Sequence, residues 1–122
     1  MKEQTPFKGG SLSNIELRVI NALLSKFNES VPASDLTPTE PEFTGVGCYV
    51  HFRPESQSKR LAHRSGFMAG IGFECEELVH PIGCMLHVQE GLLKCLECYT
   101  HAGEDWPASF SNVRIIEIAP AT

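Results

Sequence analysis

Apolar residues recur with one spacing near the N-terminus of the chain and with a different spacing in the rest of it. This change of spacing constrains the fold more than any other feature of the sequence. Residues 14–28 alone place apolar side chains three and four positions apart, the spacing of an amphipathic helix. From residue 43 onward, apolar and other residues alternate with a period of two, which is typical of strands. A helical segment followed by strand segments predicts an α+β fold. We expect one N-terminal amphipathic helix packed on a curved antiparallel sheet of four to five strands, arranged as a meander.

The predicted helix has both a start signal and an apolar stripe. Ser13 and Glu16 fit a capping box, in which each side chain accepts a hydrogen bond from the other residue's backbone N–H. The stripe consists of Ile15, Val19, Ile20, Leu23, Leu24 and Phe27. On the side expected to face water lie Glu16, Arg18, Asn21 and Ser25.

Five segments carry the strand period: residues 43–52, 67–75, 84–89, 92–99 and 113–118. Because successive side chains of a strand point to opposite sides, each residue can be assigned to one of the two faces of the predicted sheet. In the first segment one face holds Val46, Cys48, Val50 and Phe52, and the other holds Tyr49 and His51. In the second, one face holds Phe67, Ala69, Ile71 and Phe73, and the other Met68, Gly70, Gly72 and Glu74. In the fourth, Leu92 and Leu96 oppose Leu93 and Cys95.

The chain length predicts one domain over residues 1–122. Residues 1–12 are polar and read as an arm, and residues 28–42 carry three prolines, which predict an extended surface crossing without regular structure. Gly66, Gly70 and Gly72 lie inside a strand segment rather than at the start of a helix. They therefore indicate a bulge, sheet curvature and a cavity on the concave side, and not a dinucleotide site.

Composition excludes several classes of function. Fifteen acidic residues against ten basic ones give a net charge of −5, which is unfavourable for wrapping a nucleic acid. The longest apolar run is shorter than the ~20 residues of a membrane span. The first residues lack the apolar segment of a secretory signal, so we expect a cytoplasmic protein with reduced thiols. We also expect no cofactor.

Cys95 and Cys98 form a C-x-x-C pair, which is found in zinc and redox sites. In a strand, however, residues three apart point to opposite faces, so these thiols should diverge. Two further ligands at metal spacing are also missing from the sequence. We therefore expect no metal and interpret the cysteines as small core residues.

A predicted ligand site involves residues from several predicted strands. Tyr49, His51 and His87 fall on the less apolar faces, where they could meet above Met68, Gly70 and Gly72. Glu97 and Tyr99 project from one face of their strand, and Trp106 before Pro107 folds back over the sheet edge as a lid or an anchor. The alternative is that both histidines are solvated or hydrogen-bonded without a function. A catalytic serine or cysteine motif is absent.

Four of the ten basic residues lie in one predicted loop, which also contains His63. They are Arg53, Lys59, Arg60 and Arg64. The simplest interpretation is a solvated loop, and the functional one is a docking patch for an acidic protein partner or an anion. Aromatic residues are not interleaved with these charges, so single-stranded nucleic acid is not the expected ligand.

Residues 91–107 contain Leu96-Glu97-Cys98-Tyr99 followed by Gly103-Glu104-Asp105-Trp106-Pro107. This segment resembles the C-terminal strand and loop of small uncharacterised bacterial α+β proteins, some of which are accessory or immunity-like proteins of mobile elements and toxin systems. The resemblance implies an accessory or immunity-like protein. Cys95, Cys98 and His101 depart from the pattern of that group.

The function expected from these observations is that of a binding or accessory protein that acts through protein–protein contacts. The predicted sheet offers apolar side chains to both faces, and one helix of about 15 residues is only about 22 Å long. A second copy is the commonest cover for such a face, so we expect a homodimer. The alternative is a small-ligand-binding or minor enzymatic domain with a cavity near Tyr49, His51 and His87.

Overall fold

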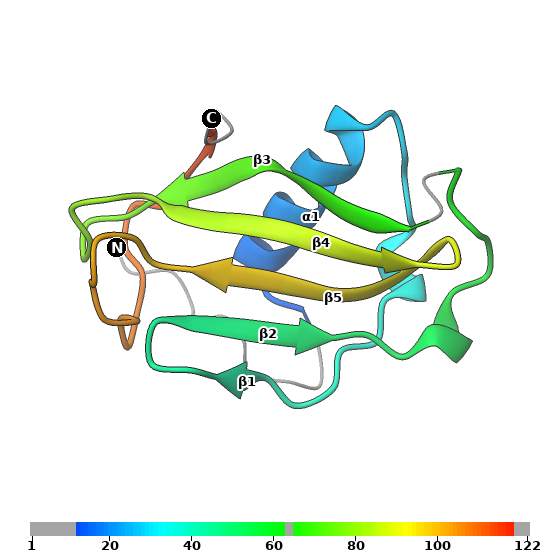
Figure 1. The fold of residues 1–122 in the computed structure, drawn as a ribbon, viewed down its shortest axis with the longest axis horizontal. Coiled ribbons are helices and arrows are strands. Elements are labelled where there is room, and N and C mark those ends of the chain that lie inside the picture. The colour runs from blue at the N-terminus through cyan, green and yellow to red at the C-terminus, as the bar shows by residue number, and fades with distance from the viewer. Residues whose placement is uncertain (1–11, 63–64, 119–122) are drawn as a thin grey trace.

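A computed structural model describes residues 12–62 and 65–118 and has one helix on one side of a single antiparallel sheet (Figure 1). The elements are α1 (Asn14–Lys26), β1 (Glu42–Phe43), β2 (Gly47–His51), β3 (Gly66–Glu74), β4 (Ile82–Gln89), β5 (Leu92–Tyr99) and β6 (Arg114–Glu117). The α+β class and the N-terminal position of the helix are confirmed. Of the predicted arm, residues 1–11 lie outside the described residues.

The sheet has six strands in the order β1-β2-β5-β4-β3-β6, rather than four to five. Strands β3, β4 and β5 form the predicted meander, while β2 lies beside β5 and β6 lies beside β3. The extra strand arises because residues 43–52 do not form one strand. Gly45 adopts a φ of +89°, and the turn at this residue folds Glu42–Phe43 back onto β2. Val46 lies in this turn and is exposed rather than buried.

The predicted capping box is present at the start of α1. The Ser13 N–H donates to Glu16 Oε1 at 2.8 Å, and the Glu16 N–H donates to Ser13 Oγ at 3.3 Å. Glu16 is therefore turned back onto the helix start and is buried, contrary to its prediction on the wet side. The helix ends at Lys26, two residues early, and Phe27 forms the C-cap and is 37% exposed instead of joining the core.

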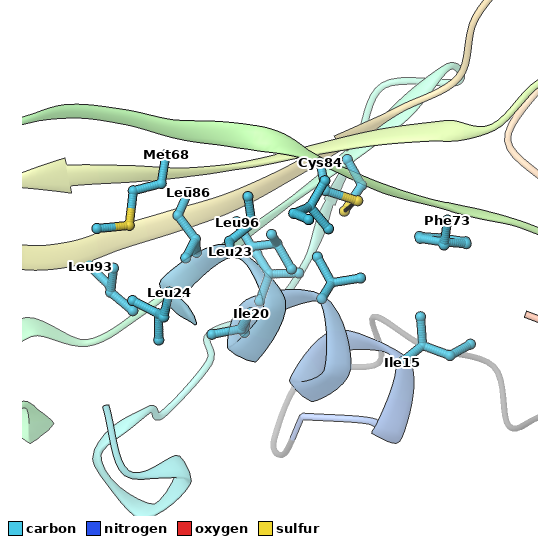
Figure 2. Close-up of a cluster of buried hydrophobic side chains, with 14 of the residues drawn as sticks. Ile15, Ile20, Leu23, Leu24, Met68, Phe73, Cys84, Leu86, Leu93 and Leu96 are labelled. Carbon is cyan, nitrogen blue, oxygen red and sulfur yellow. Dashed lines mark hydrogen bonds between the residues drawn. The ribbon is translucent and has the colours of Figure 1, made fainter. Parts of the chain in front are cut away.

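The core lies between α1 and the inner face of the sheet. Figure 2 shows Ile20, Leu23 and Leu24 of the helix among side chains from β3, β4 and β5. The strand residues closest to them in this view include Met68, Leu86, Leu93 and Leu96. All of these side chains are at most 1% exposed, so the apolar stripe of the helix is completed by the sheet.

Two bulges change the predicted faces of the sheet. In β3 the register shifts between Met68 and Ile71, where Gly70 has a φ of +102°. Met68 is therefore buried on the inner face together with Ile71 and Phe73, while Phe67 and Ala69 are exposed. The glycine pattern correctly predicted this bulge, but strict alternation across it was wrong.

In β5 the second bulge lies at Lys94, because His87 pairs with Cys95 whereas Val88 pairs with Leu93. The extra residue places Leu93 and Leu96 in the same core cluster. The expectation that these two residues oppose each other is therefore wrong, and Cys95 stands apart from them on the other face.

The proline-containing segment 28–42 is mostly irregular but is not free of regular structure. It contains a 3₁₀ turn at Ala33–Asp35, and Pro38 forms an isolated bridge with Phe52. Its last residue starts β1. Leu36 is buried in the core cluster that α1 also joins, so this residue does not cover the opposite face of the sheet.

Replacing Leu23 by alanine tests the packing of the helix. Leu23 is fully buried, so Leu23→Ala should lower the free energy of unfolding by about 2–5 kcal/mol. Asn21→Ala, on the exposed side of the same helix, should change it by less than about 0.5 kcal/mol. Urea unfolding of both variants measures the difference, and equal midpoints would contradict the packing described here.

Candidate functional site

The candidate site is the face of the sheet opposite α1, which we call the outer face. Figure 1 looks onto this face, with α1 behind the strands. Core residues such as Cys48, Val50 and Leu86 point inward, so the residues that alternate with them point outward. The outer face therefore brings together five predicted ligand residues: Tyr49, His51, His87, Glu97 and Tyr99.

Strand register places these side chains in rows across β2, β5 and β4. Cys95 is paired with His51 on one side and with His87 on the other. Glu97 is paired in the same way with Tyr49 and Met85. The register thus gives the outer face a row of two imidazoles around a thiol and, beside it, a row with one carboxylate at its centre.

Glu97 holds two partners from different strands. The Tyr49 hydroxyl donates to Glu97 Oε2 at 3.2 Å, and His87 Nε2 lies 2.8 Å from Glu97 Oε1. The negative charge of Glu97, followed by the hydrogen bond that it accepts, raises the pKa of Tyr49 above its ordinary value. Glu97 and His87 are mostly buried, with side chains 22% and 26% exposed. His87 is thus hydrogen-bonded within this cluster, whereas the His51 side chain lies outside it and is 41% exposed.

The other carboxylates of the outer face are also paired within the chain. His51 Nε2 lies 3.2 Å from Glu42 Oε1, which connects β2 to β1. Arg114 of β6 forms an ion pair with Glu74 of β3, its register partner. The rings also contact one another, since Phe67 meets His87 edge to face with centroids 4.7 Å apart.

The three hollows described on the surface do not unite the predicted ligand residues. A hollow of about 400 Å³ includes His51 and lies against Lys94 and Pro54. Another, of about 500 Å³, includes Tyr99 and His101. A third, of about 350 Å³, lies between the β3–β4 loop and β6. Tyr49 and His87 line none of the three, so the predicted cavity near Tyr49, His51 and His87 is not present among them.

Two residues expected at the site lie elsewhere. Trp106 packs on the core side against Phe110, with ring centroids 5.5 Å apart. Its backbone N–H donates to Gly45 O, so it lies beside the β1–β2 turn. Met68 is turned into the core by the bulge at Gly70. Trp106 therefore acts as the lid rather than as part of the outer-face cluster.

The basic residues of the predicted docking patch lie in the loop between β2 and β3. Arg53 is exposed and lies 4.0 Å from Glu55, and Lys59 is exposed. The Arg60 guanidinium donates to the carbonyl oxygen of Glu90. Arg64, and also His63, lie outside the described residues. Arg53 and Arg60 are thus engaged within the chain at the end of the sheet, away from Glu97.

The cysteines occupy two separate environments. Cys48, Cys98 and Cys84 form a register row on the inner face, and the sulfur atoms of Cys98 and Cys84 are 3.4 Å apart. Cys95 lies on the outer face, so the C-x-x-C thiols diverge as predicted. Burial raises the pKa of Cys48 to about 12 and that of Cys95 to about 11. Within residues 12–62 and 65–118 no group of three metal-ligating side chains is assembled.

Sequence reasoning missed four residues that shape the outer face: Phe67, Met85, Gly83 and His101. Phe67 is 59% exposed there because of the β3 bulge, which strict alternation does not contain. Gly83 pairs with Tyr99, whose ring lies over it, and a Cβ at Gly83 would come within 2.6–2.8 Å of that ring. The His101 ring packs edge to face against the Tyr99 ring, with ring centroids 5.3 Å apart. The Glu90-Gly91 turn alone would pair Gly83 with Cys98, and the bulge at Lys94 shifts this pairing by one residue to Tyr99.

Comparison of the chain with protein-family models, curated proteins and solved structures found no match. Among the described residues, α1 is too short and insufficiently apolar to cross a membrane.

The Tyr49–Glu97 contact predicts a measurable change in phenol ionisation. The chain has two tyrosines, so Tyr99→Phe leaves Tyr49 as the only one. Adding Glu97→Gln removes the negative charge and should lower the pKa of Tyr49 toward its ordinary value of 10.0. Alkaline absorbance titration of the two proteins measures this shift. Identical titration curves would show that Glu97 does not contact Tyr49 in solution.

Thiol burial predicts slow modification of four of the five cysteines. Cys75 is the only one of intermediate exposure, and the others are buried. At mildly alkaline pH, dithionitrobenzoate should rapidly modify Cys75 alone in the native protein and all five thiols in guanidinium chloride. Cys75→Ser should abolish the rapid phase. A second rapid thiol in this variant, or fewer than five thiols after denaturation without reductant, would contradict the description above.

Proposed function

We propose that the protein is a non-enzymatic binding module that acts through protein–protein contacts as a homodimer, with the outer face of the sheet as its interface. One observation carries this proposal. α1 covers only the inner face, and no other described helix or strand lies over the outer one (Figure 1). Phe67 remains 59% exposed on that face.

The size of the outer face supports a second copy as its cover. With strands about 4.8 Å apart and about 3.4 Å per residue, the described strands span roughly 600 Å² of sheet. Side chains make the accessible area larger than this flat area. A standard stable interface buries about 800 Å² on each partner, so the face is of the right size for one two-fold contact.

The charges of the outer face support the same partner. Glu42, Glu74 and Glu97 are each paired with a basic or imidazole group of their own chain. Two copies of the face can therefore meet without setting unpaired carboxylates against each other. This pairing matters because the chain as a whole carries a net charge of −5, which opposes self-association elsewhere on its surface.

A site for catalysis around Tyr49, His51 and His87 is less well supported. Tyr49 and His87 are both occupied by Glu97, and His51 is occupied by Glu42. The hollows described on the surface do not bring these three side chains to a common space. Their contacts serve to shape and neutralise the interface in the proposed homodimer.

Sedimentation tests the proposal with one charged substitution. The wild-type protein should sediment at about twice 13.5 kDa, and Phe67→Glu should sediment as a monomer. Burying the new carboxylate in the interface without a partner would cost several kcal/mol, whereas the isolated fold leaves position 67 exposed.

Val79→Glu is the matched control, because Val79 is 88% exposed in the β3–β4 loop and lies off the outer face. This variant should remain dimeric. Circular dichroism and urea unfolding should show that both variants keep the fold. A monomeric wild-type protein, or a Phe67→Glu variant that stays dimeric, would overturn the proposed interface.

A further inference from the structure

The thiols of Cys84 and Cys98 lie side by side in the core and take no part in the proposed interface. The Cys98 thiol donates a hydrogen bond to the Cys84 sulfur, and the two sulfur atoms are 3.4 Å apart. The two residues are 2% and 1% exposed. Among the described residues no other two sulfur atoms are in contact, so this pair differs from the remaining three cysteines.

The strand register places these two residues directly opposite each other. Cys84 of β4 pairs with Cys98 of β5, and these strands are the two in the middle of the sheet. The N–H of Thr100, two residues after Cys98, donates to Val46 O on the β2 side. Backbone groups two residues apart in a strand point the same way, so those of Cys98 also point toward β2. Cys98 and Cys84 therefore form a non-hydrogen-bonded pair, the type in which side chains lie closest.

This geometry fits a disulfide bond between Cys84 and Cys98. In a non-hydrogen-bonded pair the Cβ atoms are about 4.5 Å apart, at the upper end of the range of about 3.5–4.5 Å found across disulfides. Small rotations of the two side chains bring the sulfur atoms from 3.4 Å to the bond length of about 2.05 Å. Cys48 is the partner of Cys98 on the other side, but that pair is hydrogen-bonded, with Cβ atoms about 5.5 Å apart.

The closed core keeps both thiols protonated. Burial, followed by the hydrogen bond with Cys84, raises the pKa of Cys98 well above its ordinary value, and the negative charge of Glu16 acts in the same direction. Only a thiolate attacks a disulfide, so the pair reacts when the β4–β5 hairpin opens or while the chain folds. A disulfide carries no charge, so the same apolar surroundings accept it once it has formed.

We propose that Cys84 and Cys98 form a reversible disulfide bond with a low-molecular-weight disulfide as the oxidant, and that this bond cross-links the two central strands of the sheet. One cysteine thiolate attacks the oxidant, forms a mixed disulfide and releases a small thiolate. The other cysteine thiolate attacks the protein sulfur of the mixed disulfide and releases the second small thiolate. The two protons lost by the cysteines pass to the two leaving thiolates, so the pair loses two electrons and the oxidant gains them.

This redox-sensitive cross-link goes beyond the homodimer proposed above and does not depend on it. Cys84 and Cys98 belong to the core cluster on the inner face, whereas the proposed interface is the outer face. A monomer and a dimer should therefore form the bond alike.

The test measures the bond at equilibrium in the Cys75→Ser protein, which lacks the one thiol of intermediate exposure. The reduced, unfolded full-length chain is diluted into fixed ratios of 2-hydroxyethyl disulfide to 2-mercaptoethanol, either under native conditions or in guanidinium chloride. The oxidant thus reaches the thiols before the core closes. After an acid quench, mass spectrometry counts the chains that have lost two hydrogen atoms. Cleavage after lysine, arginine and glutamate residues places the four remaining cysteines on separate peptides.

The Cys84–Cys98 bond should be the main product under native conditions. Its equilibrium constant should be at least about tenfold larger there than in guanidinium chloride, because the native register holds the two thiols together. The same ratio should be reached from the oxidised chain, which shows that the bond is reversible. The bridged protein should also unfold at a higher urea concentration than the reduced protein.

Two substitutions in the same background locate the bond. Cys48→Ala is the matched control, because Cys48 is a buried cysteine of the same row that also pairs with Cys98, and this variant should retain the bond. Cys84→Ala should lose it without a native Cys48–Cys98 bond in its place. Circular dichroism of the reduced variants checks that both keep the fold.

The proposal fails if native conditions yield only free thiols or mixed disulfides, or if the native and the denatured chain form the bond equally well. It also fails if the joined peptides contain Cys48 and Cys98, or if Cys84→Ala bridges as readily as its parent. Formation of the bond in the parent protein alone decides the proposal if a variant does not fold.

Discussion

The packing of one helix against a six-stranded sheet is the contact on which the rest of this molecule depends. The 13 residues of α1 make a rod about 20 Å long, and its buried stripe, which includes the fully buried Leu23, packs on the inner face. The chain has no second described α-helix for the other face. The open face, its paired charges and its exposed ring at Phe67 all follow from this imbalance between one helix and two faces.

Much of the architecture was predictable because it rests on local patterns. The capping box at Ser13, the stripe of α1 and the bounds Leu92–Tyr99 of β5 each follow from spacing within a single segment. Strand order was not predictable in the same way, because β2 pairs with β5 across more than forty intervening residues. The faces of residues beyond a bulge were the other feature that local patterns did not predict. One extra residue at Lys94 moves Leu93 to the inner face, and periodicity alone does not contain that insertion.

The candidate site was likewise predictable only where it depends on local patterns. Alternation correctly predicted Tyr49 opposite Cys48 and Val50, and it predicted that Glu97 and Tyr99 share a face. It could not predict that Glu97 serves both Tyr49 and His87, since this depends on which strands are neighbours. The position of Lys26 was hidden for the same reason: a lysine in the last turn of a helix is expected as a favourable charge, and only the tertiary fold brings its side chain over Gly70.

The bulge at Gly70 also determines how another chain could approach the sheet. Beyond it, residues 66–69 of β3 have no ladder partner on the β6 side among the described residues, because β6 pairs only with Ile71–Glu74 and the Ile118 N–H donates to Gly70 O. The opposite edge is β1, which has two residues. An added strand would find only a short or bent row of backbone donors and acceptors on either side. Among the described residues the sheet therefore offers no long, flat edge to another chain, although its broad surface is left open to face-to-face contact.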